Sequence, residues 1–176
     1  MTTVFLAEDH PLVCQGLRAV ISAADDLQII GEASDGPAAV DGAITLGPDV
    51  VVMDLQMPGL HGIEATRQIL APRPSTTVLV LTMFEDDDTV FAAVAAGAAG
   101  YLLKGADGTD ILAAVRAVAA DQAVCGPSLA RRLRDWFRAP PAQPHIPFSD
   151  LTARERQIST TWRPGCPTPK SGPAST

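Results

Sequence analysis

The sequence has few cysteines, and they are placed where neither a disulfide framework nor a zinc site is expected. Cys14, Cys125 and Cys166 are odd in number, and their spacing matches no common metal motif. Basic residues are scarce in the first two thirds of the chain, because residues 1–121 carry 5 Lys/Arg against 17 Asp/Glu, a net charge of −12. An acidic segment of this kind repels nucleic acid and concentrates divalent cations. These features fit a protein of the reducing cytoplasm.

The sequence also lacks a long hydrophobic run. The longest apolar stretch, Ala92–Leu103, is too short and too rich in Ala and Gly to span a bilayer. The first ten residues have no basic start and already include the carboxylates of Glu8 and Asp9, which argues against a signal peptide. We therefore expect a soluble protein of cytoplasmic localisation, with no membrane contact.

Short aliphatic or β-branched runs alternate with Ala-rich helical patterns five times over residues 1–121. This alternation is typical of an α/β domain with a parallel sheet covered on both faces. The expected strands are Val4–Ala7, Leu27–Ala33, Val50–Met53, Thr77–Leu81 and Gly100–Leu103. The expected helices are Leu12–Ala23, Gly36–Leu46, Gly62–Leu70, Asp88–Ala96 and Thr109–Ala120.

Chemically active side chains follow four of these strands. Glu8 and Asp9 come after the first strand, Asp54 after the third, Thr82 after the fourth and Lys104 after the fifth. In an open α/β sheet, ligands bind beyond the carboxyl ends of the strands. Any one of these residues alone reads as a turn former or a surface group, so the prediction depends on the whole set.

Three carboxylates at one edge repel one another unless a cation joins them. Hard oxygen ligands suit Mg²⁺, which also accepts a phosphoryl oxygen, and Lys104 supplies a second positive charge. Asp54 can then act as a nucleophile on phosphorus, giving an aspartyl phosphate, with Thr82 donating a hydrogen bond to the transferred group. His10 and His61 flank this site, but we interpret both as loop residues, and Cys14 as part of the core.

Four segments together resemble the receiver domains of two-component response regulators, in the NarL/FixJ branch. They are EDHPLV at 8–13, DLQMPGLHGIEATRQI at 54–69, LTMFEDDD at 81–88 and AGAAGYLLKGA at 96–106. The resemblance covers about residues 3–121 and implies a flavodoxin-like (CheY-like) fold with a five-stranded parallel sheet. It also implies phosphotransfer from a sensor histidine kinase, with a possible homodimer formed through the receiver.

The resemblance further implies a role for each site residue. Asp54 would be the phosphoacceptor and Lys104 would pair with the phosphoryl oxygens. Asp9 would bind Mg²⁺ directly, with help from Glu8 through water and from the backbone carbonyl of Gln56. Thr82 and Tyr101 would form the switch pair, in which the ring follows the hydroxyl inward.

Beyond the receiver, expected at 1–121, the chain turns basic. Residues 122–176 carry 8 Lys/Arg against 3 Asp/Glu, a net charge of +5. We expect a basic linker helix and a Pro-rich spacer over 122–148, then a remnant of a LuxR-type helix-turn-helix domain at 149–158 (in FSDLTARERQI). Residues 159–176 read as an aberrant, disordered tail, and their codons in another frame permit a segment typical of such a domain, which suggests a frameshift near Ile158.

The sequence gives less support to three other functions. A DNA-binding transcriptional regulator, as full-length relatives of this type are, needs a recognition helix that we do not find, so we expect sequence-specific DNA binding to be lost. A phosphatase resembling the haloacid dehalogenases needs an Asp where Gln56 stands, so no enzyme is expected. A flavin-binding protein is disfavoured because Glu8 and Asp9 occupy the loop that would hold phosphate.

Overall fold

The computed structural model describes residues 1–83 and 87–125 of the chain. The predictions for the helix-turn-helix remnant (149–158), for the tail (159–176) and for all but the first four residues of the linker lie outside these residues and stay predictions.

A parallel sheet forms the centre of the domain. Its strands are β1 (Thr2–Ala7), β2 (Leu27–Ala33), β3 (Val50–Asp54), β4 (Thr77–Thr82), β5 (Gly100–Leu103) and β6 (Val124–Cys125). They lie in the order β2-β1-β3-β4-β5-β6, and every neighbouring pair is parallel. The order reverses direction between β1 and β3, which is the switch point where doubly wound sheets place their ligands.

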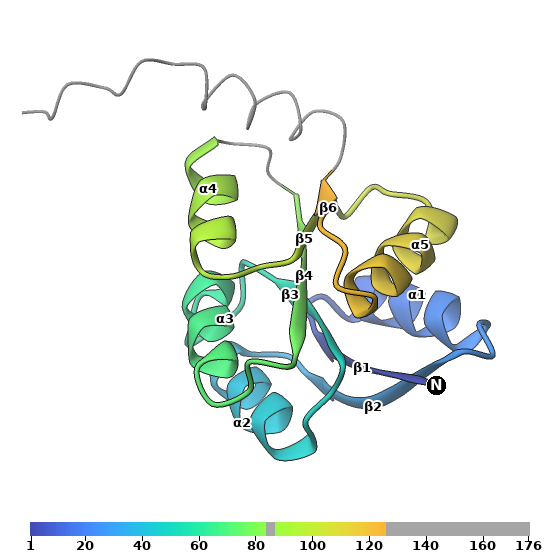
Figure 1. Ribbon diagram of the computed structural model, residues 1–176, viewed down its shortest axis with the longest axis horizontal. Helices are drawn as coiled ribbons and strands as arrows, with labels where there is room; N and C mark the ends of the chain where they lie inside the picture. Colours follow the sequence, from blue (N-terminus) through green and yellow to red (C-terminus); the bar gives the residue numbers. More distant parts are fainter. Residues whose placement is uncertain (84–86, 126–176) are drawn as a thin grey trace, which may run out of the picture. The chain divides into compact units, whose positions relative to one another are not determined.

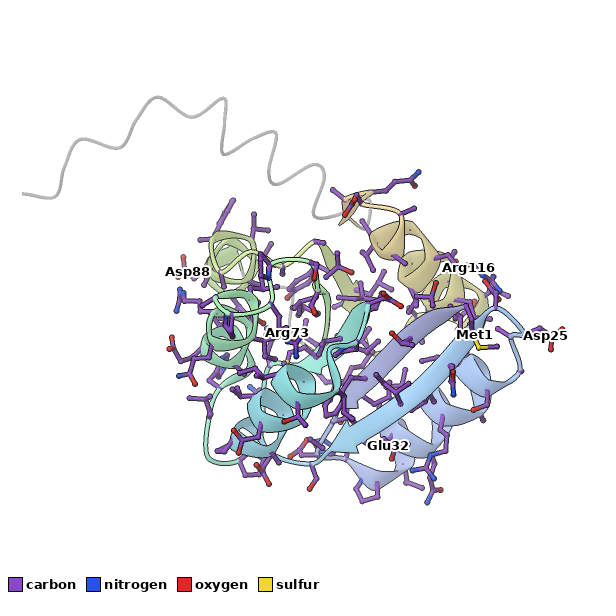
Figure 2. The ribbon with its side chains drawn as sticks, turned by 60° about the horizontal axis from the view of Figure 1, so that its bottom comes forward. Met1, Asp25, Glu32, Arg73, Asp88 and Arg116 are labelled. Carbon is purple, nitrogen blue, oxygen red and sulfur yellow. The ribbon has the colours of Figure 1, made fainter. Side chains whose placement is uncertain are left out.

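Five helices cover the two faces of this sheet. They are α1 (Pro11–Ser22), α2 (Gly36–Leu46), α3 (Gly62–Leu70), α4 (Asp87–Ala95) and α5 (Gly108–Ala119). Figure 1 shows α2, α3 and α4 on one side of the strands and α1 and α5 on the other. Arg116 and Met1 lie at the end of the domain opposite to Glu32, which stands near the carboxyl end of β2 (Figure 2).

The two apolar layers follow from the alternation of side chains along the strands. In β3, Val51 and Met53 pack with the layer under α2, α3 and α4, whereas Val50 and Val52 pack with the layer under α1 and α5. All five residues of β3 are buried, as expected for a strand covered on both faces. The carboxyl ends of the central strands are therefore fixed by a core on either side.

The five strands and five helices predicted within residues 1–121 are all present, with bounds that differ by two residues at most. The prediction of a five-stranded sheet needs one addition, because the two-residue strand β6 extends the sheet next to β5. The chain reaches β6 through a turn at Asp121, whose φ is 56°. Within the described ranges, no helix is long and apolar enough to cross a membrane.

Candidate functional site

The predicted site residues meet at the carboxyl edge of the sheet. Glu8 and Asp9 follow β1, Asp54 and Thr82 end β3 and β4, and Lys104 follows β5 directly. Glu8, Asp54 and Thr82 are buried, with exposed fractions of 4%, 2% and 1%. Polar groups that are this deeply buried need hydrogen-bond partners or a bound ligand, so this edge of the sheet must provide one or the other.

Lys104 reaches across the sheet to two carboxylates. Its ammonium Nζ donates a hydrogen bond to Glu8 Oε1 at 2.8 Å and lies 2.8 Å from Asp54 Oδ2. The lysine side chain is only 4% exposed. Burial by itself lowers the pKa of Lys104, but the hydrogen bonds and charges of Asp54 and Glu8 outweigh it, so the pKa lies above its ordinary value. Lys104 is therefore a permanent positive charge at neutral pH.

One ammonium does not satisfy the carboxylates around it. Glu8, Asp9, His10 and Asp54 each present a ligand atom within 4.8 Å of the others. Among the described residues, buried Glu8 Oε2 has no hydrogen-bond partner, whereas Asp9 Oδ1 has His10 Nδ1 at 2.6 Å and Asp54 Oδ2 has Lys104 Nζ at 2.8 Å. The single ammonium offsets only part of the negative charge of the three carboxylates. A buried carboxylate oxygen without a donor, next to two further carboxylates, fits a divalent cation.

The loop after β3 places the candidate acceptor. The Gln56 backbone N–H donates to Asp54 Oδ1 at 3.2 Å, and Gly62 N donates to Leu55 O at 2.9 Å. A Cβ on Gly62 would lie 2.2 Å from the carbonyl oxygen of Asp54, so only glycine allows α3 to start this close to the strand. The first turn of α3 and the acceptor carboxylate are thus held as one unit.

Thr82 and Tyr101 lie on neighbouring strands, and both are buried. The backbone N–H of Lys104 donates to Thr82 O at 2.9 Å, which links the ends of β4 and β5. Tyr101 pairs in register with Val80 on one side and with Cys125 of β6 on the other. The two predicted switch residues therefore belong to the same stretch of sheet as the lysine.

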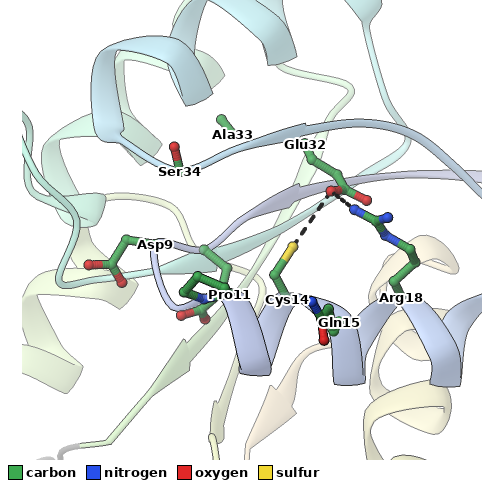
Figure 3. A pocket seen from close by; sticks show the side chains of 9 residues that line it. Asp9, Pro11, Cys14, Gln15, Arg18, Glu32, Ala33 and Ser34 are labelled. Atoms are coloured by element: carbon green, nitrogen blue, oxygen red, sulfur yellow. Dashed lines mark hydrogen bonds and ion pairs between the residues drawn. The ribbon is translucent and has the colours of Figure 1, made fainter.

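A pocket of about 380 Å³ adjoins the acidic edge between α1 and β2. Figure 3 shows Cys14 and Arg18 of α1 converging on Glu32, with Asp9 and Pro11 at the other end. Cys14 Sγ donates to Glu32 Oε2 at 3.6 Å, and Arg18 pairs with the same oxygen. Burial, followed by the charge of Glu32, raises the pKa of the Cys14 thiol, so this cysteine is not an activated nucleophile.

Sequence reasoning missed His10. Its Nδ1 lies 2.6 Å from Asp9 Oδ1 and 3.3 Å from Glu8 Oε1, so the ring belongs to the acidic cluster. The signal was its position directly after two carboxylates, but a sequence does not tell which way a side chain in a loop turns. The Cys14, Arg18 and Glu32 contact was also missed, because it joins residues far apart in the chain.

The chain is similar to known proteins over most of its length. Residues 4–116 match the family of response regulator receiver domains. The chain is 40% identical over 158 residues to the Transcriptional regulatory protein LiaR of Bacillus subtilis (strain 168), a match that covers 90% of this chain and 74% of that protein.

Two solved structures extend the comparison to three dimensions. A two-component response regulator of the LuxR family from Aurantimonas sp. SI85-9A1 superposes with a TM-score of 0.74 at 32% identity, covering 79% of this chain and 99% of that one. The isolated REC domain of RcsB from Salmonella enterica serovar Typhimurium, solved in the presence of the phosphomimetic BeF3⁻, gives 0.68 at 28% identity over 74% and 96% of the two chains.

Proposed function

The chain belongs to the family of response regulator receiver domains of two-component systems, and from this premise we propose that Asp54 is its phosphoacceptor. The observation that carries the proposal is the environment of this carboxylate. Asp54 is buried at the end of β3, has the Lys104 ammonium 2.8 Å from Oδ2, and stands among two further carboxylates. Phosphorylation by a kinase is general in this family, and we propose a sensor histidine kinase as the donor.

The acidic cluster suits Mg²⁺. Asp9, Asp54 and the backbone carbonyl of Gln56 would hold the ion, with Glu8 acting through water, because the cluster offers hard oxygen ligands and Glu8 Oε2 is buried without a donor. A bound divalent ion supplies charge neutralisation at the oxygens of the incoming phosphoryl group. Nucleophilic attack, orientation of the carboxylate and further charge compensation are assigned to residues of the chain itself.

Asp54 acts as the nucleophile. One carboxylate oxygen attacks phosphorus while the bond from phosphorus to the donor nitrogen or oxygen breaks, and the leaving group keeps the electron pair. The Gln56 N–H, 3.2 Å from Asp54 Oδ1, orients the carboxylate, and Lys104 offsets the negative charge that arrives. Lys104 then passes from an ion pair with Asp54 to one with the phosphoryl oxygens.

Thr82 and Tyr101 are proposed to convert this event into a change of surface. The Thr82 hydroxyl belongs to the strand next to Asp54, in register with Leu103 of β5, and donates to the phosphoryl group. Tyr101 is 6% exposed, so its ring already occupies a buried position on β5. A dianionic group at Asp54 biases the position of the two side chains, and with them the face formed by α4 and β5.

The process that phosphorylation regulates is proposed from the relatives of the chain. LiaR is by its name a transcriptional regulatory protein, and we propose that phosphorylation here likewise serves gene regulation or contacts between proteins. The prediction that sequence-specific DNA binding is lost depends on residues 126–176, outside the described part of the chain.

The test is phosphorylation of the full chain by acetyl phosphate, followed by intact mass. We expect wild type to gain one phosphoryl mass with Mg²⁺ and none with a chelator, and Asp54→Asn to gain none. Asp49→Asn is the matched control, because this aspartate precedes the other end of β3 and should leave the gain unchanged. Phosphorylation of Asp54→Asn to the same extent as wild type would refute the assignment.

A further inference from the structure

The acidic cluster contains one group that a magnesium site does not need. His10 Nδ1 lies 2.6 Å from Asp9 Oδ1, and its ligand atom is within 4.8 Å of those of Glu8, Asp9 and Asp54. Mg²⁺ prefers oxygen ligands, whereas imidazole nitrogen suits zinc, nickel and related transition ions. A nitrogen at this position therefore changes which ions the cluster binds well.

The position of His10 is fixed by its neighbours in the chain. Its backbone N–H donates to Glu8 Oε1 at 3.0 Å, and Pro11 follows it as the first residue of α1. A residue before proline is restricted to extended conformations, and His10 has φ −88° and ψ 112°. The imidazole is thus attached to a stiff backbone beside the carboxylates.

The other described histidine provides a contrast. His61 also precedes a helix, and its Nδ1 accepts a hydrogen bond from Ile63 N at 3.3 Å, so its ring caps α3. His10 makes no such cap for α1. Its Nδ1 lies instead near Asp9 Oδ1 and Glu8 Oε1. The side chain is 66% exposed, which leaves room at the mouth of the site for the remaining ligands of an ion.

The buried side of the cluster points to a cation independently of His10. Glu8 is 4% exposed, and among the described residues its Oε2 accepts no hydrogen bond. Asp54 is 2% exposed, and one ammonium is shared between the two residues. An ion at this place would therefore meet carboxylates from inside the domain and an imidazole from its mouth.

We propose that His10 is a ligand for a divalent transition ion of the zinc, cobalt or nickel type at the acidic site, and that its imidazole raises the affinity of the site for these ions without raising that for Mg²⁺. The inference deepens the proposed function, since it rests on the same cluster as phosphorylation of Asp54. Affinities of mixed nitrogen and oxygen sites generally rise along the first-row series toward copper, so the added nitrogen favours these ions.

Titration calorimetry on the untagged full chain, with Zn²⁺ and separately with Mg²⁺, tests the inference, together with the visible absorption of added Co²⁺. We expect His10→Asn to weaken Zn²⁺ binding by about tenfold or more, since even groups that only orient a ligand contribute about 10- to 100-fold to affinity. It should also change the Co²⁺ spectrum and leave the Mg²⁺ affinity within about twofold. His61→Asn, the same substitution at a histidine that caps a helix, should change none of these values.

Equal effects of His10→Asn on Zn²⁺ and Mg²⁺, or no effect on either, would overturn the inference. So would Zn²⁺ binding that survives Asp9→Asn unchanged, because the ion would then lie elsewhere. The proposed function is tested apart, by phosphorylation with Mg²⁺. A protein that is phosphorylated on Asp54 but shows no selective loss in His10→Asn retains its function and loses only the imidazole ligand.

Discussion

Replacing Asp54 by Asn should make the metal-free protein more stable. The cluster contains the carboxylates of Glu8, Asp9 and Asp54 and the ammonium of Lys104, so its net charge is −2. Without a metal ion, Asp54 is both a partner of the lysine, at the same distance as Glu8, and a member of a crowded group of like charges. The sign of its contribution depends on which of the two effects is larger.

The distances allow an estimate. Asp54 Oδ2 lies 2.8 Å from Lys104 Nζ, an attraction of about 6 kcal/mol at an effective dielectric constant of about 20. Its ligand atom lies within 4.8 Å of those of Glu8 and Asp9, so the two repulsions amount to about 7 kcal/mol or more. Neutralising Asp54 also removes the cost of burying its charge. We expect Asp54→Asn to raise the free energy of unfolding by about 1–2 kcal/mol.

Urea unfolding with a chelator and with excess Mg²⁺ is the assay. In the chelator, Asp54→Asn should unfold at higher urea than wild type. With Mg²⁺ the gap should close or reverse, because a ligand that binds only the folded state stabilises it, and wild type has the better site. Lys104→Met should go the other way and lose about 3–5 kcal/mol, since buried carboxylates are left without their cation. If Asp54→Asn is the less stable protein in the chelator, repulsion among the carboxylates is not the dominant effect.

Two further predictions concern the scaffold. Gly62→Ala should lower the free energy of unfolding by about 1–3 kcal/mol, because the added Cβ would meet the Asp54 carbonyl oxygen at 2.2 Å. Gly16→Ala is the control: its Cβ would have nothing within 4 Å, so the free energy of unfolding should rise by about 0.5–1 kcal/mol, and denaturant titrations of both variants check the signs. The backbone and side-chain hydrogen bonds of Thr3 lower the pKa of Asp49. The stability that Asp49 adds relative to Asp49→Asn should therefore be present above about pH 4 and disappear as the pH falls through the lower pKa of the folded state. Unfolding of both proteins across this pH range is the measurement, and a difference in stability that widens in acid would contradict the assignment.

The fold was predictable because each strand and helix has its own local pattern of apolar residues in the sequence. Val50–Met53 is an unbroken apolar run, and it proves to be a strand buried on both faces. The turn into β6 was not predictable in the same way. It needs a left-handed residue, and Asp121 with φ 56° supplies it where a glycine would have signalled a turn. A two-residue strand without an apolar run of its own depends entirely on the edge of β5 beside it.

The sequence predicts which residues form the site better than it predicts which of their atoms are in contact. The carboxyl ends of parallel strands lie at one edge of a sheet, so the sequence indicates that Glu8, Asp54 and Lys104 share that edge. It does not indicate that Lys104 divides its ammonium between Glu8 and Asp54, which lie on different strands. Nor does it indicate the direction of the His10 ring. Both depend on side-chain torsions that the surroundings select after the backbone is in place.

The way in which Lys104 is shared has a consequence for signalling. Its side chain joins the ends of β1, β3 and β5, while its backbone N–H is bonded to Thr82 O on β4. If Asp54 is phosphorylated as proposed and Lys104 moves to the phosphoryl group, the contacts of this one residue with four strand ends are the ones expected to change. Of these, β5 also carries Tyr101 and pairs with β6, the last described segment before residues 126–176. In this sheet, β4 and β5 are the two hydrogen-bonded strands that separate β3, which ends at Asp54, from β6.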